Sequence, residues 1–590
     1  MEIIQNEKTV RQTENGAIGM SVSKIWSMVS GMERERRGET GEKFTYPYLG
    51  TVAKELDAVT GYSANGGRGE WKIPSEGSDA RLKHYKETGE ALRKRTVKEP
   101  AGELAVEVTE AGGKNLVAEV KLFAVADGMT KESFTYADFC PDFLREFTGE
   151  DGKLIIRIEA GHYLLEVSKG SEYSIHKEII VIRKQEKTLI PVVLNRFVNL
   201  SEEGWYVGDL HHHSVYSSPL YPPQGTDYVF DTPEEVMMSM RAKGLTFGAL
   251  SDHHNVLNHR EWETMQREDF LPLLSKEIST SNGHILSLNV DPDVIYKIPQ
   301  PEDRTEEYLR NEFIRTTKEI RDNGGFPQVN HPRDMQKAIS FPPEFTDMIE
   351  IFDTMEIWNG SHPLADGTTN DEAFRLWLSL LEEGRFLPAT TGSDTHDIRL
   401  VTWMLSFGYV LGLYREVERQ KDTLPMEYKE KAEYFLGMLK PQLPTLQVWL
   451  KTGLTSGCVR TYVHAPGERT PKNLLTHNKS GHSFVTNGPV LIAEIAGKHM
   501  GEVAKFPVDG EEITAHLTIL SNRPLTKLSI WQNGGRTEEL PLPEVEAENG
   551  CYDYSGEVTF SAEQAKWVFF RVQADYTVQA VTNPIFLEAE

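Results

Sequence analysis

The chain has 590 residues, 39% of them hydrophobic and 26% charged. This length is greater than a single hydrophobic core usually supports, so about three domains are expected, and the hydrophobic content is too high for a largely disordered chain. Its 63 Lys and Arg against 89 Asp and Glu give a formal charge of -26, which repels polyanions and argues against a long nucleic-acid partner. The three cysteines, Cys140, Cys458 and Cys551, form neither a disulfide framework nor a zinc-ribbon spacing, so any metal must be held by histidine and carboxylate side chains.

No apolar run in the sequence approaches the roughly 20 residues that a membrane helix requires. The first residues, MEIIQNEKTVRQTENG, lack the basic flank and hydrophobic core of a secretory signal. The sequence therefore predicts a cytoplasmic protein without a membrane partner, and it leaves the oligomeric state open.

The two ends of the chain differ in pattern. Residues 1–100 are polar and glycine-bearing without a sustained period, which predicts a poorly defined lead segment with helical pieces near 22–32 and 80–94. From about residue 101 short alternating runs such as ELAVEV and KLIIRIEA appear, and similar runs, WVFFRVQAD among them, close the chain. Such runs are typical of antiparallel sheets, so we expect β-sandwiches over 101–200 and 483–590.

Between 201 and 482, strand-like segments alternate with helical ones, which favours a parallel sheet or barrel. The first helix is marked by Thr232 as N-cap, Pro233 at its first position and Gly244 as its stop. Further helical segments are predicted at 304–323, 370–383 and 400–455. The last of these is an insertion that packs on the barrel or closes over its site as a lid.

Clusters of acidic residues and histidines follow the strand-like runs of this central part. Gly208-Asp209-Leu210-His211-His212-His213-Ser214 follows Trp205-Tyr206-Val207. Because successive side chains of a strand point to opposite faces, His211 and His213 project together while His212 points away. The other clusters are Ser251-Asp252-His253-His254-Asn255, Glu277, Asn330-His331-Pro332 and Gly392-Ser393-Asp394-Thr395-His396. Side chains at successive strand ends converge on one face of an α/β barrel.

Eight residues are candidate metal ligands: His211, His213, His253, Glu277, His284, His331, Asp394 and His396. Imidazole nitrogen and carboxylate oxygen suit Zn²⁺, Mn²⁺ and Fe²⁺, and a carboxylate can bridge two ions. Two ions roughly 3.5–4 Å apart lower the pKa of a bridging water and stabilise the attacking and leaving oxygens of a displacement. The set therefore predicts hydrolytic chemistry.

Five motifs in order, D-L-H-x-H-S, S-D-H, the glutamate Glu277, N-H-P and G-S-D-x-H, resemble those of the polymerase-and-histidinol-phosphatase (PHP) superfamily of metal-dependent hydrolases. Four further segments are similar to those of its CehA/McbA-type members: Gly204-Trp205-Tyr206, Glu356-Ile357-Trp358-Asn359-Gly360, Phe484-Val485-Thr486-Asn487-Gly488-Pro489 and Thr582-Asn583-Pro584-Ile585. The resemblance covers about 101–590 and implies an α/β fold, a distorted (β/α)7 PHP-type barrel flanked by N-terminal and C-terminal β-sandwiches.

The resemblance also implies up to three ion positions. The first ion would be bound by His211, His213, Glu277 and Asp394. The second would share Glu277 and bind His331 and His284. The third would lie near His253 and His396. The loop 214–220 departs from the family pattern because it contains no histidine or acid. Two divalent ions, Zn, Mn or Fe, are therefore expected, and His253 and His396 either complete a third site or contact substrate.

Substrate contacts are expected from polar side chains near these clusters. Asn359, Arg333 and Arg399 are the candidates, since amide and guanidinium groups hydrogen-bond ester and phosphate oxygens. Asn359 is equally suited to capping a turn, and a surface ion pair is the alternative role of each arginine, as it is for Arg460.

Four neighbouring residues are expected to have lesser roles. Asp209 and Asp252 should orient imidazoles instead of binding metal, and His254 and His259 should be solvated. Glu312 is expected on an outer helix, where its replacement by glutamine should be nearly silent.

The sequence therefore predicts a metal-dependent hydrolase that cleaves a small ester by a metal-bound hydroxide, with catalytic roles for Glu277, Asp394, His253 and His396. The superfamily resemblance implies a phosphoester substrate, and the nearer branch also implies a carbamate or carboxylic ester. The alternative from another class is a non-catalytic binding protein stabilised by its metal, and a nuclease is disfavoured by the charge of the chain.

Overall fold

The computed structural model describes residues 97–590 apart from 138–142, 218–228, 255, 281–282, 290–304, 335–339, 401–413, 415–416, 420, 423–425, 442, 507–511, 562–564 and 590. The helical pieces expected near 22–32 and 80–94 lie outside the described residues. So do most of the first half of the expected insertion over 400–455 and the end of the loop over 214–220.

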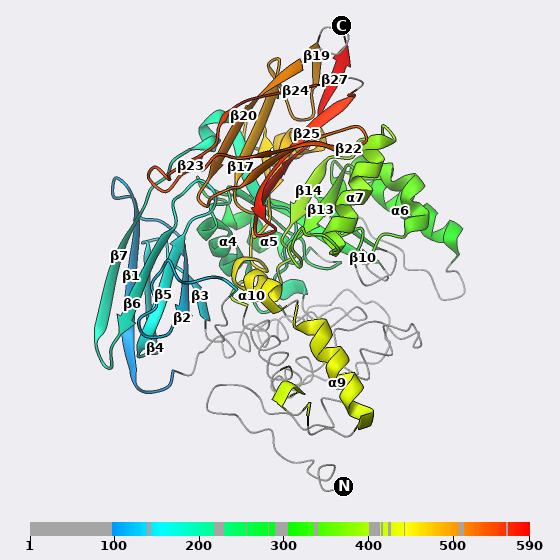
Figure 1. The fold of residues 1–590 in the computed structure, drawn as a ribbon. Coiled ribbons are helices and arrows are strands. Elements are labelled where there is room, and N and C mark those ends of the chain that lie inside the picture. The colour runs from blue at the N-terminus through cyan, green and yellow to red at the C-terminus, as the bar shows by residue number, and fades with distance from the viewer. Residues whose placement is uncertain are drawn as a thin grey trace.

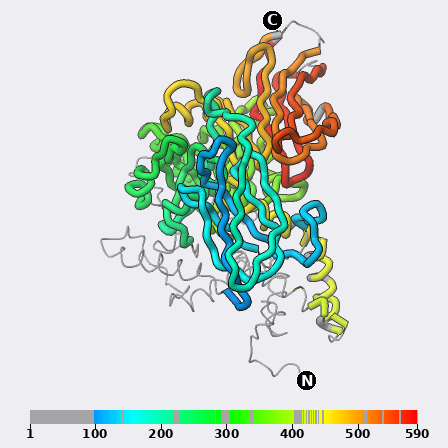
Figure 2. Tube along the Cα trace, turned by 90° about the vertical axis from the view of Figure 1, so that its left-hand side faces the viewer, coloured from blue at the N-terminus to red at the C-terminus, as the bar shows by residue number. Residues whose placement is uncertain are grey.

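Two sheets face one another in the N-terminal part of the described chain (Figures 1 and 2). One has the order β4 (Lys153–Glu159), β1 (Ala101–Glu110) and β7 (Lys187–Leu194), and the other has the order β3 (Phe143–Phe147), β2 (Glu119–Ala124), β5 (Gly161–Ser168) and β6 (His176–Ile182). Strands β4 and β7 alternate between more and less exposed positions, because one face of the sheet packs inward and the other meets water. Leu104 and Ile158 from one sheet and Leu122 and Leu165 from the other share one hydrophobic core.

The central strands lie side by side in chain order. They are β8 (Trp205–Asp209), β9 (Phe247–Leu250), β10 (Leu271–Thr280), β11 (Gly283–Leu288), β12 (Phe326–Asn330), β13 (Thr354–Asn359) and β14 (Ala389–Gly392). Every residue of β9, β11, β13 and β14 is buried, as expected for strands that are covered on both faces. Their carboxyl ends carry the clusters that the sequence singled out.

The described part of the chain is a mixed α/β fold without a closed barrel, so the expected distorted (β/α)7 barrel is not confirmed. The strand ladder is an open path, and β11 runs antiparallel to both β10 and β12. The carboxyl ends of the outer strands β8 and β14 are nevertheless joined by two backbone hydrogen bonds beyond the strands, from Asp394 to His211 at 2.8 Å and from His213 to Thr395 at 3.1 Å. A hairpin between β10 and β11 replaces one helical crossover, which is why the alternation of strands and helices is incomplete.

Four helices of the described chain pack against the outside of the sheet: α4 (Pro233–Ala242), α6 (Glu306–Asp322), α7 (Thr369–Glu382) and α11 (Pro471–Lys479), with the single-turn α5 (His259–Trp262) beside α4. Helix α10 (Leu443–Thr452) follows α9 (Met426–Leu439), which extends away from these strands (Figure 1). The predicted start of α4 is confirmed, because the Thr232 side chain accepts the Glu235 N–H in a capping box. No helix of the described residues is long and apolar enough to cross a membrane.

Glu312 lies on α6, one of the helices outside the central strands, as expected, but it does not face solvent. Its side chain lies on the buried side of α6 with only 8% of its surface exposed, and it pairs with Arg315. The ion pair offsets the free-energy cost of burying the Glu312 carboxylate, because the long arginine side chain can place its guanidinium beside it. Glu307, in the first turn of the same helix, is exposed.

The C-terminal strands continue the central sheet. Strand β15 (Arg460–His464) pairs with β8, and the sheet continues through β16 (Ser483–Thr486), β26 (Val578–Thr582), β25 (Trp567–Asp575), β21 (Lys527–Gln532) and β22 (Gly535–Pro541), with β19 (Val503–Phe506) and β27 (Ile585–Ala589) beside it. A second sheet contains β17 (Val490–Ile495), β18 (Lys498–His499), β20 (Glu512–Ser521), β23 (Tyr552–Asp553) and β24 (Gly556–Ser561). Side chains such as Leu517 and Phe570 join both sheets in one core.

Side-chain hydrogen bonds of Asn583 connect the C-terminal strands to the central ones. Its buried amide accepts the Ala389 N–H at 2.8 Å and donates to the Ala389 carbonyl at 3.1 Å and the Ser483 hydroxyl at 2.8 Å. The bond to Ala389 fixes the start of β14, the strand that leads to Asp394.

We therefore predict that Asn583→Ala lowers the free energy of unfolding by about 2–3 kcal/mol, because it leaves buried backbone groups without partners. Chemical denaturation followed by tryptophan fluorescence would measure the loss. Asn311→Ala, an exposed position on α6, is the matched control and should leave stability unchanged; equal stability of the two variants would contradict the prediction.

Candidate metal centre

The structure brings all eight predicted ligands together at one edge of the central sheet, where the parallel strands end and the antiparallel β11 begins with His284. Their potential ligand atoms form four overlapping groups, each with all its atoms within 4.8 Å of one another: His211, His213 and Glu277; His211, His331 and Asp394; Glu277, His284 and His331; and His213, His253 and His396. His212 points away, as the strand alternation predicts, and its Nε2 lies 2.8 Å from the Ser456 hydroxyl.

The first predicted ligand set has the spacing that a metal ion requires. Nε2 of His211 lies 3.1 Å from Nε2 of His213, 3.2 Å from Glu277 Oε1 and 3.3 Å from Asp394 Oδ1. Nε2 of His213 lies 3.0 Å from Asp394 Oδ1 and 3.8 Å from Glu277 Oε2. Ligands about 2.0–2.2 Å from a tetrahedral zinc ion lie about 3.3–3.6 Å apart. The four side chains therefore fit one ion with little rearrangement.

The tautomers of the two imidazoles follow from what their other nitrogens contact. Nδ1 of His211 faces Glu356 Oε1 at 3.2 Å, and because an ionised carboxylate only accepts, Nδ1 carries the hydrogen. The Ser217 hydroxyl donates to Asp252 at 2.6 Å, so its oxygen accepts from Nδ1 of His213 at 2.9 Å. Both Nε2 lone pairs therefore point into the same space as the carboxylates, and such a set of donors requires a cation.

Glu277 is the residue that the groups share. Oε1 lies 3.0 Å from Nδ1 of His284 and 3.3 Å from Nε2 of His331, and Oε2 lies 2.9 Å from Nδ1 of His253. Asn330 donates to Oε1 at 2.9 Å. A carboxylate with imidazoles on both oxygens can bridge two ions, which fits the second predicted set of Glu277, His331 and His284.

The third group lies on the more open side of the centre. The rings of His253 and His396 lie 4.4 and 4.1 Å from the ring of His213. Their side chains are 17% and 27% exposed, and that of Asp394 is 19% exposed, whereas His211 and His213 are fully buried. Any molecule that enters from solvent therefore meets this side first.

Two residues of the site have backbone conformations that residues other than glycine rarely adopt. His331 has φ of 25° and Asp394 has φ of 53°, values that cost free energy and persist where surrounding contacts impose them. The Glu356 carboxylate accepts the His331 N–H at 2.7 Å, and the His211 carbonyl accepts the Asp394 N–H at 2.8 Å. At Gly392 a Cβ would collide with His211 and Glu356, so the strand end must carry glycine to admit both side chains.

The site concentrates negative charge. Burial opposes ionisation of Glu277, but His284 and His211 hold the pKa of its carboxyl well below the usual value. Burial also disfavours a charged His211, but Asp394, Glu277 and Glu356 raise the pKa of its imidazole well above the usual value. The carboxylates therefore need a positive charge beside them, which a proton or a metal ion can supply.

The two aspartates expected to orient imidazoles differ in role. Asp252 acts on His213 through Ser217. Asp209 instead accepts the backbone N–H groups of Ser393 and Gly457, both at 2.9 Å, and so holds together the chain segments around the site.

The three residues that were expected to contact substrate bond to other groups of the protein in the structure. Asn359 donates to Asp394 Oδ2 at 3.1 Å and to Glu356 Oε2 at 3.3 Å, so it positions a predicted ligand. Arg333 donates to the carbonyls of Pro332 and Phe341, both at 3.0 Å. Arg399 pairs with Glu146 at 2.9 Å and with Glu235 at 3.4 Å. The ion-pair alternative therefore describes Arg399, and Arg333 braces its own loop.

His254 and His259 were expected to be solvated, but both are only partly exposed. Burial and the charge of His253 lower the pKa of His254 to about 3. Nε2 of His259 lies 2.9 Å from the Ser275 carbonyl. The His254 backbone N–H donates to the Glu277 carbonyl at 2.8 Å, so both residues lie beside β10.

The sequence analysis missed two residues that orient the imidazoles, Glu356 and Ser217. Glu356 lies within the apolar strand β13 and is fully buried. A charged residue between Met355 and Ile357 was a signal that could have identified it, because carboxylates are rarely buried without a partner. Ser217 gave no such signal in a loop without acids.

No protein-family model and no curated protein matches the chain. Among solved structures, an amidohydrolase from Chromobacterium violaceum with bound sulfate and no metal is 19% identical, with a TM-score of 0.22 over 32% of this chain and 87% of that one. A protein from Bifidobacterium adolescentis named as a metal-dependent phosphoesterase is 16% identical, with a TM-score of 0.23 over 32% of this chain and 87% of that one. TM-scores of this size do not establish a shared fold, so function must be inferred from the side chains of the site.

Glu356→Gln should lower metal affinity by about 10–100-fold, as expected when a partner that orients a metal-bound histidine is lost. Competition with a metal-binding dye would measure the affinity, and thermal unfolding would verify that the variant folds. Glu307→Gln, which removes an exposed carboxylate from α6, is the control. Equal metal affinity of the two variants would show that Glu356 does not support His211.

Proposed function

We propose that the chain is a metal-dependent hydrolase that cleaves a small ester, most directly a phosphoester. The observation that carries the proposal is the convergence of two imidazole lone pairs and two carboxylates at the spacing of a tetrahedral ion. The order of motifs that resembles the PHP superfamily agrees with this function.

The residues would divide between two ions, with Glu277 able to contribute to both. His211, His213 and Asp394 would complete the first set, and His284 and His331 the second. Divalent ions held in this way polarise an ester oxygen and lower the pKa of a bound water to about 7. Glu277 keeps the two sets adjacent, and Asn359 and Glu356 fix the direction of Asp394 and His211.

His253 and His396 are placed to act on the substrate. Nδ1 of His396 lies 2.8 Å from the Asp394 backbone carbonyl, which only accepts, so Nδ1 carries the hydrogen and Nε2 is the nitrogen that can accept a proton. Both imidazoles lie on the more exposed side of the centre. We assign them to substrate binding and proton transfer, with a third ion among His213, His253 and His396 as the alternative.

A binding protein with a structural metal is the rival function. Structural zinc sites are usually closed by four protein ligands, whereas catalytic sites keep an open position. Here eight donors gather without a cysteine, and one side of the set reaches solvent through Asp394, His253 and His396. This asymmetry favours catalysis.

The first test concerns the shared carboxylate. Protein purified without chelator should contain about two equivalents of transition metal, as the two-ion arrangement requires. Glu277→Gln keeps the size of the side chain but removes its charge, so it should lose one or both equivalents and most of the turnover while still folding. Elemental analysis and circular dichroism would measure both effects.

Glu307→Gln is again the matched control, in place of Glu312, whose burial and pairing with Arg315 make it unsuitable. It should retain full metal and full turnover. If Glu277→Gln were indistinguishable from Glu307→Gln, the bridging role and the hydrolase built on it would be abandoned.

The second test concerns the bond that is cleaved. Turnover of nitrophenyl phosphate mono- and diesters should exceed that of nitrophenyl acetate and of a nitrophenyl carbamate, because two adjacent cations match the charge on a phosphoryl group better than that on an acyl group. Addition of a chelator should abolish the activity, and metal should restore it. Faster cleavage of the acetate or carbamate would assign the chain to the acyl class.

A further inference from the structure

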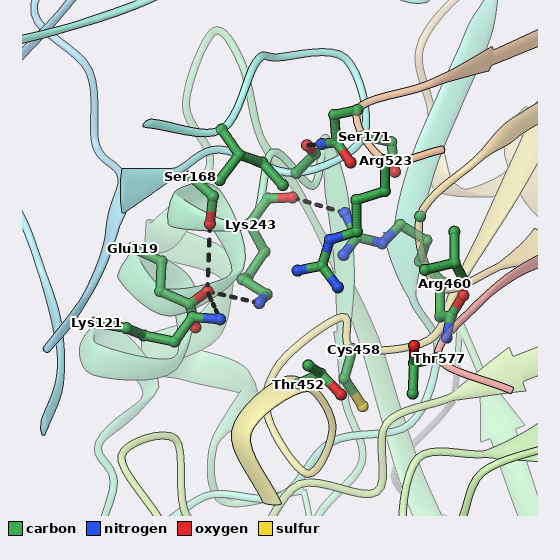
Figure 3. Close-up of a pocket in the computed structure, with 16 residues that line it drawn as sticks. Glu119, Lys121, Ser168, Ser171, Lys243, Thr452, Cys458, Arg460, Arg523 and Thr577 are labelled. Atoms are coloured by element: carbon green, nitrogen blue, oxygen red, sulfur yellow. Dashed lines mark hydrogen bonds and ion pairs between the residues drawn. The ribbon is translucent and has the colours of Figure 1, made fainter. Parts of the chain in front are cut away.

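A second cluster of charged side chains lines a cavity of about 60 Å³ that contains none of the eight predicted metal ligands. The cavity lies where several elements meet (Figure 3). Glu119 and Lys121 come from β2, Lys243 from the end of α4, Arg460 from β15 and Arg523 from the turn after β20.

Positive charge predominates around this cavity. Four cations line it against one carboxylate, Glu119, which pairs with Lys243 at 2.8 Å and lies 3.7 Å from Lys121. Lys121 also pairs with Glu166 at 2.8 Å. Glu119 also pairs with Arg145, and Glu166 with Lys177, both at 3.2 Å, so these two carboxylates do not balance the cations around the cavity, in a chain whose formal charge is -26.

The two arginines carry the unbalanced charge. Arg460 is 4% exposed; its Nη1 donates to the Lys243 carbonyl at 2.9 Å, while its buried Nε has no hydrogen-bond partner among the described residues. Nη2 of Arg523 donates to the Tyr136 hydroxyl at 3.1 Å, and its guanidinium lies 5.0 Å from the centre of that ring. Within the described chain, neither guanidinium forms an ion pair with a carboxylate.

The side chains of Arg523 and Lys243 point toward one another across the cavity (Figure 3). Burial, together with the charges of Lys121, Arg145 and Arg460, lowers the pKa of Lys243 to about 8 even though Glu119 acts in the opposite direction. Like charges that face one another at a buried site cost free energy unless an anion lies between them.

The size of the cavity limits what it accommodates. A buried water needs roughly 10–15 Å³ of such volume, so this cavity holds roughly four to six groups of that size. A tetrahedral oxyanion has five heavy atoms, which fits, whereas a nucleotide does not.

We propose that this cavity is a binding site for a small oxyanion of the size and charge of phosphate, held by Arg460, Arg523 and Lys243. Guanidinium and ammonium groups are the usual partners of such anions. The site is separate from the metal centre and does not depend on the function proposed for it.

Calorimetric titration of the metal-loaded full chain with inorganic phosphate tests the proposal. Wild type should show a phosphate site whose affinity falls at least tenfold in Arg523→Gln, because one of three cations is lost, while turnover of a small ester is unchanged. Sulfate should bind the same site, and acetate, with one charge and two oxygens, should bind much more weakly.

Arg157→Gln is the control of equal charge change, since Arg157 is exposed on β4, and it should bind phosphate as wild type does. Arg523→Lys should recover part of the affinity, which separates loss of charge from misfolding. Phosphate affinity that is the same in wild type and Arg523→Gln, or absence of a saturable site in wild type, would overturn the proposal.

Discussion

The structure around the candidate centre depends on the burial of a carboxylate, Glu277, among imidazoles at the ends of the central strands. A buried charge is costly unless paired and hydrogen-bonded, and here His284, His331 and His253 all lie within 3.3 Å of its oxygens. The carboxylates of Asp394 and Glu356 lie close by and increase the demand for a cation. A bound metal ion would satisfy this demand, and the proposed hydrolase function depends on it.

Contacts from the rest of the fold stabilise the strained backbone and the buried charges of this site. Positive φ at His331 and Asp394 and the absence of a side chain at Gly392 are tolerated because hydrogen bonds to Glu356 and His211 fix the strand ends. Asp209 accepts backbone N–H groups from Ser393 and Gly457. The rigidity needed to position metal ligands therefore comes from long-range contacts between strand ends.

The flanking sheets contribute to this rigidity. The C-terminal strands continue the central sheet through β15 and β16, and α7 packs between the two parts, with Trp377 5.0 Å from Phe569 of β25. The N-terminal sheets meet the central strands through a charged contact in which Glu119 pairs with Lys243. Its excess of positive charge distinguishes this contact from the candidate metal centre, where the carboxylates of Glu277, Asp394 and Glu356 lie among imidazoles.

The sequence by itself determined the features that depend on neighbours along the chain. Strand alternation placed His211 and His213 on one side, and the capping residues at Thr232 set the start of α4. Only the tertiary structure decided features whose partners lie far apart in sequence. Glu356 meets His211 across 145 positions, Arg399 pairs with Glu146 across 253, and β11 reverses direction. Local patterns carry no information about such distant pairings, because the packing of the whole chain selects them.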